Sequence, residues 1–274
     1  MKLVYLTAKK YPATTADHIF IKEMAKAFAN ILANDFLLVV ANDSASELRD
    51  IPHKNLGLRI SRCISLWYFV WLPLFIGKKR LNSKDTIFLS NDPNLLSILV
   101  FWKRLLNLRF HVVSEWHMIF GNWRDKFVSK NSTGLITTTN HLKNIISQKF
   151  NVGGDKILSV YGGVDLEKFN KMNKSVSSLR KILGLPEDLF IIGYVGFYKT
   201  MGMAKGLDTM IDALEFIEDI NIRMAFVGGR GGEIEEYKSL AREKGVLDRV
   251  IFVPFVPTDD VPIYEQVMNI LVVP

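Results

Sequence analysis

A lysine at the start of an expected helix is the clearest candidate for chemistry in this sequence. The apolar run Phe190–Val195 predicts a buried strand that breaks at Gly196, and a helix-periodic segment begins at Lys205-Gly206. A loop between a strand's carboxyl end and a helix's amino end is where open α/β sheets place ligands. Free N–H groups and the positive end of the helix dipole favour phosphate there. Lys205 would add a full positive charge, so the sequence predicts a phosphate-binding loop.

A glycine cluster after another expected strand is the second candidate. Gly228 and Gly229 end the apolar segment that begins at Ile222, and Arg230 follows directly. Because glycine has no Cβ, backbone there could approach a nucleotide closely. The alternative is an ordinary glycine turn, which we favour for Gly231 and Gly232.

Alternating strands and helices must position these loops. Apolar runs predict strands at residues 2–7, 36–41, 56–60, 85–90, 110–114, 135–138, 156–160, 190–195, 222–227, 249–253 and 269–273. Helical periodicity predicts helices at residues 18–32, 94–106, 141–150, 207–217, 233–243 and 259–266. Residues 170–188 are more polar and are interpreted as a boundary region. The pattern predicts an α/β fold of two Rossmann-like domains with parallel sheets facing across a cleft, over residues 1–168 and 169–274.

The composition limits the partners that this chain is expected to have. The 274 residues carry a formal net charge of +7 and are 49% apolar, which is typical of a globular protein with an anionic partner. That partner could be a sugar nucleotide, a phospholipid surface or a nucleic acid; no recognised nucleic-acid module is present, so nucleic acid ranks last. Cys63 is the only cysteine, which excludes an internal disulfide and a cysteine metal site and favours the reducing cytoplasm. We expect no metal and no cofactor.

The sequence signals of a nicotinamide dehydrogenase, and those of a signal peptide or a transmembrane helix, are missing from this sequence. A nicotinamide dehydrogenase needs Gly-x-Gly-x-x-Gly after a strand, and Leu6–Tyr11 has no glycine. The amino terminus has no signal-peptide cleavage region, and no apolar run reaches the ~20 residues that a transmembrane helix needs.

The aromatic, apolar segment at residues 64–80 has two interpretations. Basic residues flank it, namely Arg59, Arg62 and Lys78-Lys79-Arg80. It could lie in a membrane interface, with its cations on lipid phosphates, and so hold the protein peripherally on the inner face of the membrane. The alternative, which we rank ahead, is a core helix, kinked at Pro73, that covers a sheet.

Four stretches, taken together, resemble the family 4 (group 1) retaining glycosyltransferases, whose two-domain architecture is called GT-B. They are Tyr161-Gly162-Gly163-Val164-Asp165 with Phe169; Gly196 with Lys205-Gly206; Val227-Gly228-Gly229 with Gly231; and Val250–Pro257 followed by Tyr264 and Asn269–Pro274. The resemblance covers residues 156–274 well and the amino-terminal half loosely. It implies transfer of a sugar from a nucleotide sugar to a hydroxyl acceptor, with retention and without a metal. Surface polysaccharide or glycolipid biosynthesis, with a sugar or lipid-linked acceptor, is the expected setting.

The resemblance also implies roles for individual residues. Lys205 is expected to bind the donor diphosphate, together with Gly196 and Gly206. The family's arginine on the diphosphate maps to Phe197, so Lys199 is the expected stand-in and Arg230 a further source of a guanidinium.

The same resemblance places other residues near the donor or at the crossover. Gly228 and Gly229, with Arg230, are expected near the nucleotide. His117, just after an expected strand, is expected near the donor sugar and acceptor, with Glu115 a weaker candidate on the same loop. Asp165 is expected to be a structural cap in a hinge.

Departures from the family pattern leave an alternative. The family's Glu-x7-Glu element lies beyond a segment like Ile270–Pro274, so we expect a truncated chain with an incomplete second domain. The missing element, together with Phe197 in place of the family's arginine, leaves open a second interpretation. The chain could be a non-catalytic nucleotide-sugar-binding or partner subunit with a degenerate donor site.

Overall fold

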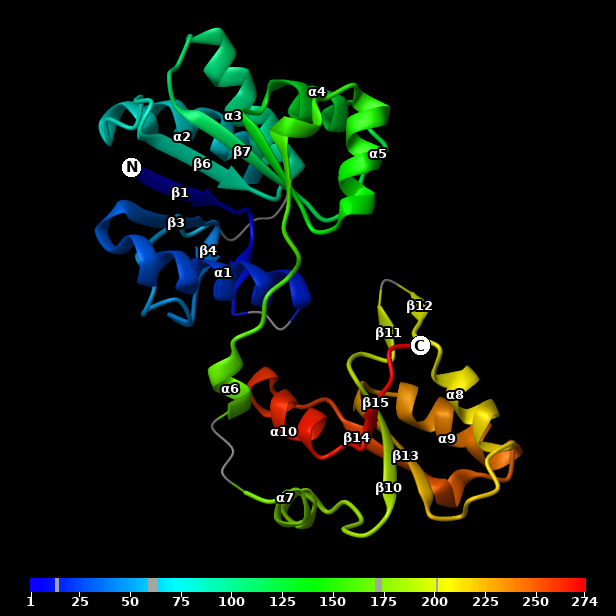
Figure 1. Cartoon of the computed structure of the whole chain (residues 1–274). Helices are drawn as coiled ribbons and strands as arrows, with labels where there is room; N and C mark the ends of the chain where they lie inside the picture. Colours follow the sequence, from blue (N-terminus) through cyan, green and yellow to red (C-terminus); the bar gives the residue numbers. More distant parts are fainter. Residues whose placement is uncertain (13–14, 59–63, 171–173, 201) are drawn as a thin grey trace. The chain divides into compact units, whose positions relative to one another are not determined.

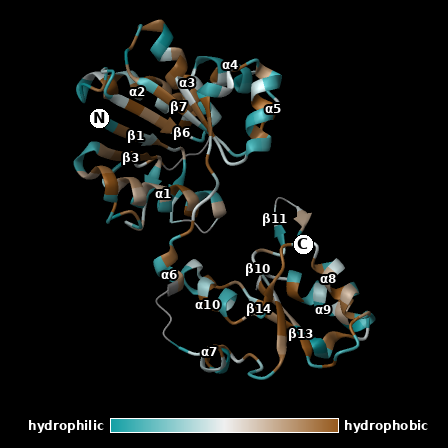
Figure 2. Cartoon of the chain, in the orientation of Figure 1, coloured by the Kyte–Doolittle hydropathy of each residue, from teal (hydrophilic) through white to brown (hydrophobic). Residues whose placement is uncertain are grey.

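The chain folds into two compact units, Met1–Gly163 and Val164–Pro274 (Figure 1). The computed structural model describes residues 1–12, 15–58, 64–170, 174–200 and 202–274. Each unit is built on its own parallel sheet, so the predicted α/β fold with two Rossmann-like sheets is confirmed. The central strands of both sheets are coloured as hydrophobic in Figure 2.

The first unit contains a seven-stranded parallel sheet in the order β5-β3-β1-β6-β7-β8-β9. Its strands are β1 (Lys2–Leu6), β3 (Phe36–Val40), β5 (His53–Asn55), β6 (Thr86–Ser90), β7 (His111–Trp116), β8 (Gly134–Thr137) and β9 (Ile157–Ser159). Two short strands, β2 (Lys10–Tyr11) and β4 (Asn42–Asp43), pair in parallel beside it. The strands alternate their side chains between two apolar faces, which is why both faces need cover.

Helices cover the two faces of this sheet unequally. The face that carries Val4 and Leu6 packs against helices α2 (Ile64–Lys78), α3 (Pro93–Leu105), α4 (Trp123–Asn131) and α5 (Asn140–Phe150). The opposite face, which carries Leu3 and Tyr5, packs against α1 (Ala16–Leu32). The crossovers after β6, β7 and β8 therefore all place their helices on one side of the sheet.

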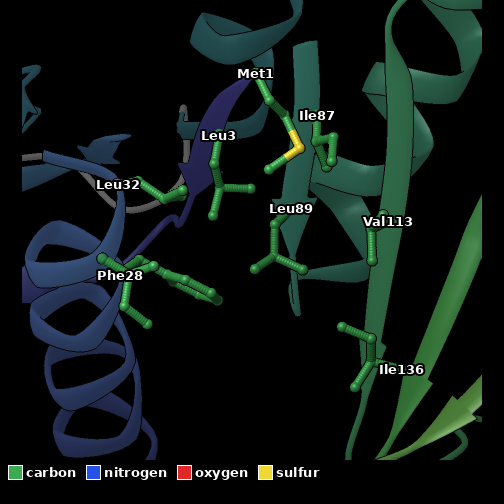
Figure 3. A pocket seen from close by; sticks show the side chains of 9 residues that line it. Met1, Leu3, Phe28, Leu32, Ile87, Leu89, Val113 and Ile136 are labelled. Carbon is green, nitrogen blue, oxygen red and sulfur yellow. The ribbon is translucent and has the colours of Figure 1, made fainter. Parts of the chain in front are cut away.

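An apolar groove remains on the α1 side of the sheet. It has a volume of about 310 Å³ and is lined only by apolar side chains, among them Phe28 and Leu32 of α1. Leu89, Val113 and Ile136 line it from β6, β7 and β8 (Figure 3). With no polar group in its lining, this groove is not a candidate for binding phosphate.

The second unit is a four-stranded parallel sheet in the order β14-β13-β10-β15. Its strands are β10 (Phe190–Val195), β13 (Ile222–Gly229), β14 (Val250–Pro254) and β15 (Ile270–Leu271). Helices α8 (Leu207–Leu214) and α9 (Glu233–Glu243) pack on one face, and α7 (Val176–Leu183) and α10 (Val261–Gln266) on the other. A small antiparallel hairpin, β11 (Lys199–Thr200) with β12 (Met203–Ala204), lies between β10 and α8.

Three details differ from the sequence predictions. The strand expected at residues 56–60 is found earlier, at His53–Asn55, and residues 59–60 lie outside the described residues. The polar stretch 170–188 contains a helix, α7, because its buried Leu179 and Arg180 pack onto the sheet. The units divide after Gly163 rather than after residue 168, because α6 (Leu166–Asn170) packs against α10 of the second unit.

A buried arginine ties α7 to the carboxyl-terminal strand of the second unit. Arg180 is 4% exposed, and its guanidinium donates to the carbonyl oxygens of Val267, Glu187 and Leu189. It also donates to Oδ1 of Asn269 at 2.6 Å, and this same oxygen accepts the N–H of Ile191 in β10. One side chain therefore joins acceptors from two segments, residues 187–189 and 267–269, to α7 through charged hydrogen bonds.

Arg180→Ala is expected to destabilise the second unit by about 3 kcal/mol, because buried acceptors lose charged donors. Thermal unfolding followed by far-UV circular dichroism measures this loss. The exposed Arg242→Ala is the matched control and should change stability little. Equal stability of the two variants would contradict this role for Arg180.

Candidate functional site

Two glycines bring the ends of β10 and β13 into direct contact. Gly228 has φ of +114°, and a Cβ built on it would lie 2.3 Å from the carbonyl oxygen of Gly196. The N–H of Gly196 donates to the carbonyl of Val227 at 2.9 Å. Only glycine fits at position 228, so the loops that follow these two neighbouring strands begin side by side.

These loops assemble a stack of one guanidinium and two aromatic rings. The Cζ atom of Arg230 lies 3.6 Å from the ring centroid of Phe197 and 5.2 Å from that of Phe255. The two rings are nearly parallel, at 18°, with centroids 5.9 Å apart. This geometry is a cation–π arrangement. The Phe197–Arg230–Phe255 stack joins the loops after β10, β13 and β14 at the carboxyl edge of the sheet, where ligands bind in such folds.

Buried tyrosines hold the loop after β10 in place. The hydroxyl of Tyr194 donates to the carbonyl of Phe197 at 2.8 Å, and that of Tyr198 donates to the carbonyl of Phe226 at 2.7 Å. Tyr198 is fully buried, and its burial raises the pKa of its hydroxyl, which stays protonated as a donor. The first hydrogen bond holds the carbonyl of Phe197 itself and the second holds the next residue, so together they fix where Phe197 lies.

Lys205 lies at the end of this loop, directly before α8. Its backbone N–H donates to the carbonyl of Tyr198 at 3.1 Å, and Gly206 follows with φ of +75°. The side chain of Lys205 is half-buried, and among the described residues its ammonium has no ion pair or hydrogen bond. The structure thus presents a cation without a protein anion at the amino end of a helix.

Lys199 points elsewhere. Its ammonium contacts both carboxylate oxygens of Glu236 on α9, at 2.6 and 2.8 Å. Hydrogen bonding to Glu236 raises the pKa of Lys199. Because Lys199 already has an anionic partner, its ammonium is less available to a ligand than that of Lys205.

The predicted histidine of the first unit lies beside a buried carboxyl group. His117 follows β7, and its ring meets that of Phe20 edge-on with centroids 4.8 Å apart. Its Nε2 is 3.8 Å from Oε1 of Glu115, whose Oε2 accepts a hydrogen bond from Tyr5 at 3.2 Å. Burial raises the pKa of Glu115 to about 7 and lowers that of His117. A carboxyl with a pKa near neutrality beside an imidazole is a candidate for proton exchange with a ligand.

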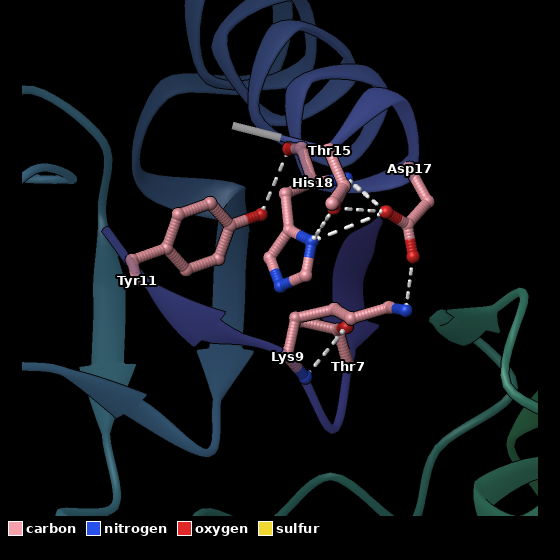
Figure 4. A network of polar contacts seen from close by, with 6 residues as sticks. All are labelled: Thr7, Lys9, Tyr11, Thr15, Asp17 and His18. Atoms are coloured by element: carbon pink, nitrogen blue, oxygen red, sulfur yellow. Dashed lines mark hydrogen bonds and ion pairs between the residues drawn. The ribbon is translucent and has the colours of Figure 1, made fainter. Parts of the chain in front are cut away.

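The loop after β1 does not offer a free lysine. The ammonium of Lys9 contacts the carboxylate of Asp17, which also accepts hydrogen bonds from the hydroxyl of Thr15 and the N–H of His18 (Figure 4). Burial acts to raise the pKa of Asp17, but these bonds lower it overall. The ammonium of Lys9 is therefore already paired with a carboxylate, which disfavours Lys9 as a phosphate ligand.

The structure adds site residues that sequence reasoning missed. Phe255 and the tyrosines Tyr194 and Tyr198 gave no separate signal, because aromatic residues near strand ends are usually core residues.

Asp165 does cap α6 as predicted: its side chain accepts the N–H of Glu167 at 3.0 Å. Over the described ranges, no cluster of three or more His, Cys, Asp or Glu side chains could hold a metal ion.

The pKa of Glu115 predicts a pH-dependent stability of the first unit. In the folded state this group keeps its proton up to pH of about 7, whereas in the unfolded chain it ionises near pH 4.5. Stability should fall as the pH rises through this window, by on the order of 3 kcal/mol, because only the unfolded state releases the proton there. Glu115→Gln should remove most of this decline.

Urea unfolding followed by tryptophan fluorescence tests this, since all five tryptophans lie in the first unit. The exposed Asp50→Asn should keep the wild-type pH dependence. A decline that persists in Glu115→Gln would show that another group is responsible.

Comparisons with known proteins match the second unit to a family model. Residues 175–274 match the model described as "Glycosyl transferases group 1". A D-inositol 3-phosphate glycosyltransferase from Xylanimonas cellulosilytica is 29% identical over 150 residues, which are 52% of this chain and 35% of that protein. The matched stretch thus spans about a third of the length of this curated relative.

Solved structures share the fold of nearly the whole chain. A structure of Anabaena Alr3699/HepE in complex with UDP has a TM-score of 0.76 at 17% identity, covering 99% of this chain and 73% of that one. The apo lipopolysaccharide outer core galactosyltransferase WaaB has a TM-score of 0.71 at 15% identity, with the same coverage. The predicted resemblance is confirmed: the chain has the fold of GT-B proteins, and its residues 175–274 form a glycosyl transferases group 1 domain.

Proposed function

We propose that this chain is part of a glycosyltransferase that moves a sugar from a nucleotide-sugar donor to a hydroxyl acceptor. The observation that carries the proposal is a pair of cations, Lys205 and Arg230, on the loops after the adjacent strands β10 and β13 of the group 1 domain. The similar Alr3699/HepE structure holds UDP, which supports a nucleoside diphosphate as the ligand.

The two cations suit the charge that such a reaction develops. When the bond between the anomeric carbon and the diphosphate oxygen breaks, its electron pair stays on the leaving nucleoside diphosphate. Fixed cations stabilise that negative charge most in the transition state. Lys205 provides a point charge at a helix start, and Arg230 a fork that can bind two phosphate oxygens.

The glycines of the site bring backbone within reach of the same ligand. Gly196 and Gly206 bound the loop that carries Lys205, and Gly228 and Gly229 precede Arg230. We propose that the diphosphate lies against the first pair and the nucleoside near the second. Phe197 takes part through its ring, which orients the guanidinium of Arg230.

The acceptor chemistry is proposed for the first unit. The acceptor hydroxyl forms a new bond to the anomeric carbon and loses its proton, with retention of configuration. His117, whose imidazole faces Glu115, is the proposed residue near the donor sugar and acceptor. A surface polysaccharide or glycolipid product, made on the cytoplasmic side of a membrane, agrees with the resemblance to a lipopolysaccharide galactosyltransferase.

Calorimetric titration tests the donor site directly. UDP, GDP, ADP and dTDP, and their glucose conjugates, are titrated into the 274-residue chain. We expect one base to bind measurably, and Lys205→Ala and Arg230→Ala each to weaken it roughly tenfold or more, because a charged hydrogen bond to phosphate is lost. The exposed Lys181→Ala is the matched control and should bind as the wild type does.

A rescue variant separates a local role of Arg230 from a general loss of charge. Phe197→Arg in the Arg230→Ala background returns a guanidinium to the same place and should restore part of the affinity. If no diphosphate binds the wild type, or if both alanine variants bind as tightly as it does, the proposed donor site is wrong. Binding without sugar transfer or hydrolysis, measured with the complete enzyme, would favour the non-catalytic alternative.

A further inference from the structure

Helix α2 is apolar on two opposite faces. Its inner face, which includes the buried Tyr68 and Leu72, packs into the core of the first unit. Its outer face carries Leu66, Val70 and Leu74, which are 68%, 60% and 68% exposed. Residues spaced by four lie on one stripe of a helix. The core-helix interpretation is therefore confirmed for the inner face but does not explain the outer one.

Helix α3 extends this stripe into a wider surface. Phe101 and Leu105 of α3 and the following Leu106 are 41%, 61% and 50% exposed. The two helices lie side by side: the rings of Phe69 and Phe101 are 5.4 Å apart, and the indole of Trp102 donates to the carbonyl of Phe69 at 2.9 Å. We call Leu66, Val70, Leu74, Phe101, Leu105 and Leu106 the α2–α3 apolar surface.

Clustered, exposed apolar side chains of this kind mark an interaction site rather than ordinary surface. Five large residues on two adjacent helices, with Leu106 just after α3, gain nothing for the fold by facing water. The helices are also not packed against another part of the first unit on this side, since each residue is at least two-fifths exposed.

Cations border the α2–α3 apolar surface. Lys78, at the end of α2, is followed by Lys79 and Arg80, and Lys84 lies on the connection to β6; all four are exposed. None of the four forms an ion pair with a described residue. Between Ile64 and Lys84 the sequence has no acidic residue, and the exposed Asp85 follows Lys84, so Lys78, Lys79 and Arg80 form the uniformly basic part of this margin.

The acidic side chain nearest to α3 in sequence has a structural task. Asp92 caps α3, and its Oδ1 accepts the N–H groups of Asn94 and Leu95 at 2.8 and 3.2 Å. Its carboxylate therefore interacts with the amino end of α3 and pairs with none of Lys78, Lys79, Arg80 and Lys84. Arg59 and Arg62, which the sequence also places beside this segment, lie outside the described residues.

We propose that the α2–α3 apolar surface docks the protein onto an anionic bilayer, with its apolar side chains at the acyl boundary and its cations on lipid phosphates. Apolar residues bordered by lysine and arginine fit that interface. The half-exposed indoles of Trp67 and Trp71, stacked 5.1 Å apart on α2, are typical of the headgroup level. No described helix is long and apolar enough to cross a membrane.

A bilayer fits better than a second copy of the chain. Two copies meeting through this surface would add a second set of Lys78, Lys79 and Arg80 and no acidic residue from positions 64–84 to pair with them. An anionic bilayer instead gains from each cation, roughly fivefold in affinity per residue near the surface. The docking deepens the proposed function, because it points to an acceptor embedded in the membrane. Only this statement about the acceptor rests on the proposed function; the membrane contact itself does not.

Flotation with lipid vesicles tests the proposal. The 274-residue chain is mixed with vesicles of phosphatidylcholine alone or of phosphatidylcholine with phosphatidylglycerol. We expect flotation with the anionic vesicles and little with the neutral ones. The triple variant Leu66→Gln, Val70→Thr, Leu74→Gln should reduce the bound fraction at least tenfold, and Lys78→Gln, Lys79→Gln, Arg80→Gln should remove the preference for phosphatidylglycerol.

A matched control replaces three exposed apolar residues of the second unit. Ile182→Gln, Phe216→Gln and Ile220→Gln change residues that are 63%, 83% and 75% exposed and should leave flotation unchanged. Circular dichroism and nucleotide titration on every variant show that it is folded.

Three results would overturn the membrane assignment. They are no flotation of the wild type, flotation that the α2 triple variant does not change, and a concentration-dependent dimer that this variant abolishes, which would make the surface a contact between copies. If the wild type floats, the α2 triple variant does not, and no nucleotide binds, the membrane assignment stands. The glycosyl-transfer function is then the proposal that is rejected.

Discussion

The close approach of Gly228 to the carbonyl of Gly196 is the constraint on which the candidate donor site depends. Parallel pairing of β10 with β13 brings the two strand ends to the same edge, and the absence of a Cβ at position 228 lets them touch. The loops that follow start side by side as a result. Phe197 from one and Arg230 from the other can then stack, with Tyr194 fixing the carbonyl of Phe197. A larger residue at position 228 would separate the cations of the site.

Much of the fold followed from the sequence, because buried parallel strands read as apolar runs and the helices between them keep their period. Lys205 was predicted for the same reason, since strand, glycine and helix start are local signals. The partnership of Arg230 with Phe197 was not local: it depends on strand order, which brings together residues 33 positions apart (230 − 197). Likewise, no sequence pattern indicated that Lys199 on β11 would pair with Glu236 on α9.

Helix α2 shows why two interpretations of one segment need not compete. An almost uniformly apolar sequence could not reveal which face is buried, because periodicity carries no signal when nearly every position is apolar. The fold resolves the ambiguity by burying Tyr68 and Leu72 and leaving Leu66, Val70 and Leu74 outside. Glu115 is a related case, because the sequence around this carboxyl does not show that it is buried. Its burial appears only in the fold, where Tyr5 on β1 lies beside it and donates a hydrogen bond to it.

The central claim is that Arg230, held on Phe197, replaces the arginine expected at position 197 in binding the donor diphosphate. A crystal structure of the chain with UDP tests it most directly. The account predicts that phosphate oxygens lie within hydrogen-bond distance of both the guanidinium of Arg230 and the ammonium of Lys205, with the ring of Phe197 still beneath the guanidinium. A diphosphate bound away from Arg230, or held by Lys199 after its release from Glu236, would contradict it.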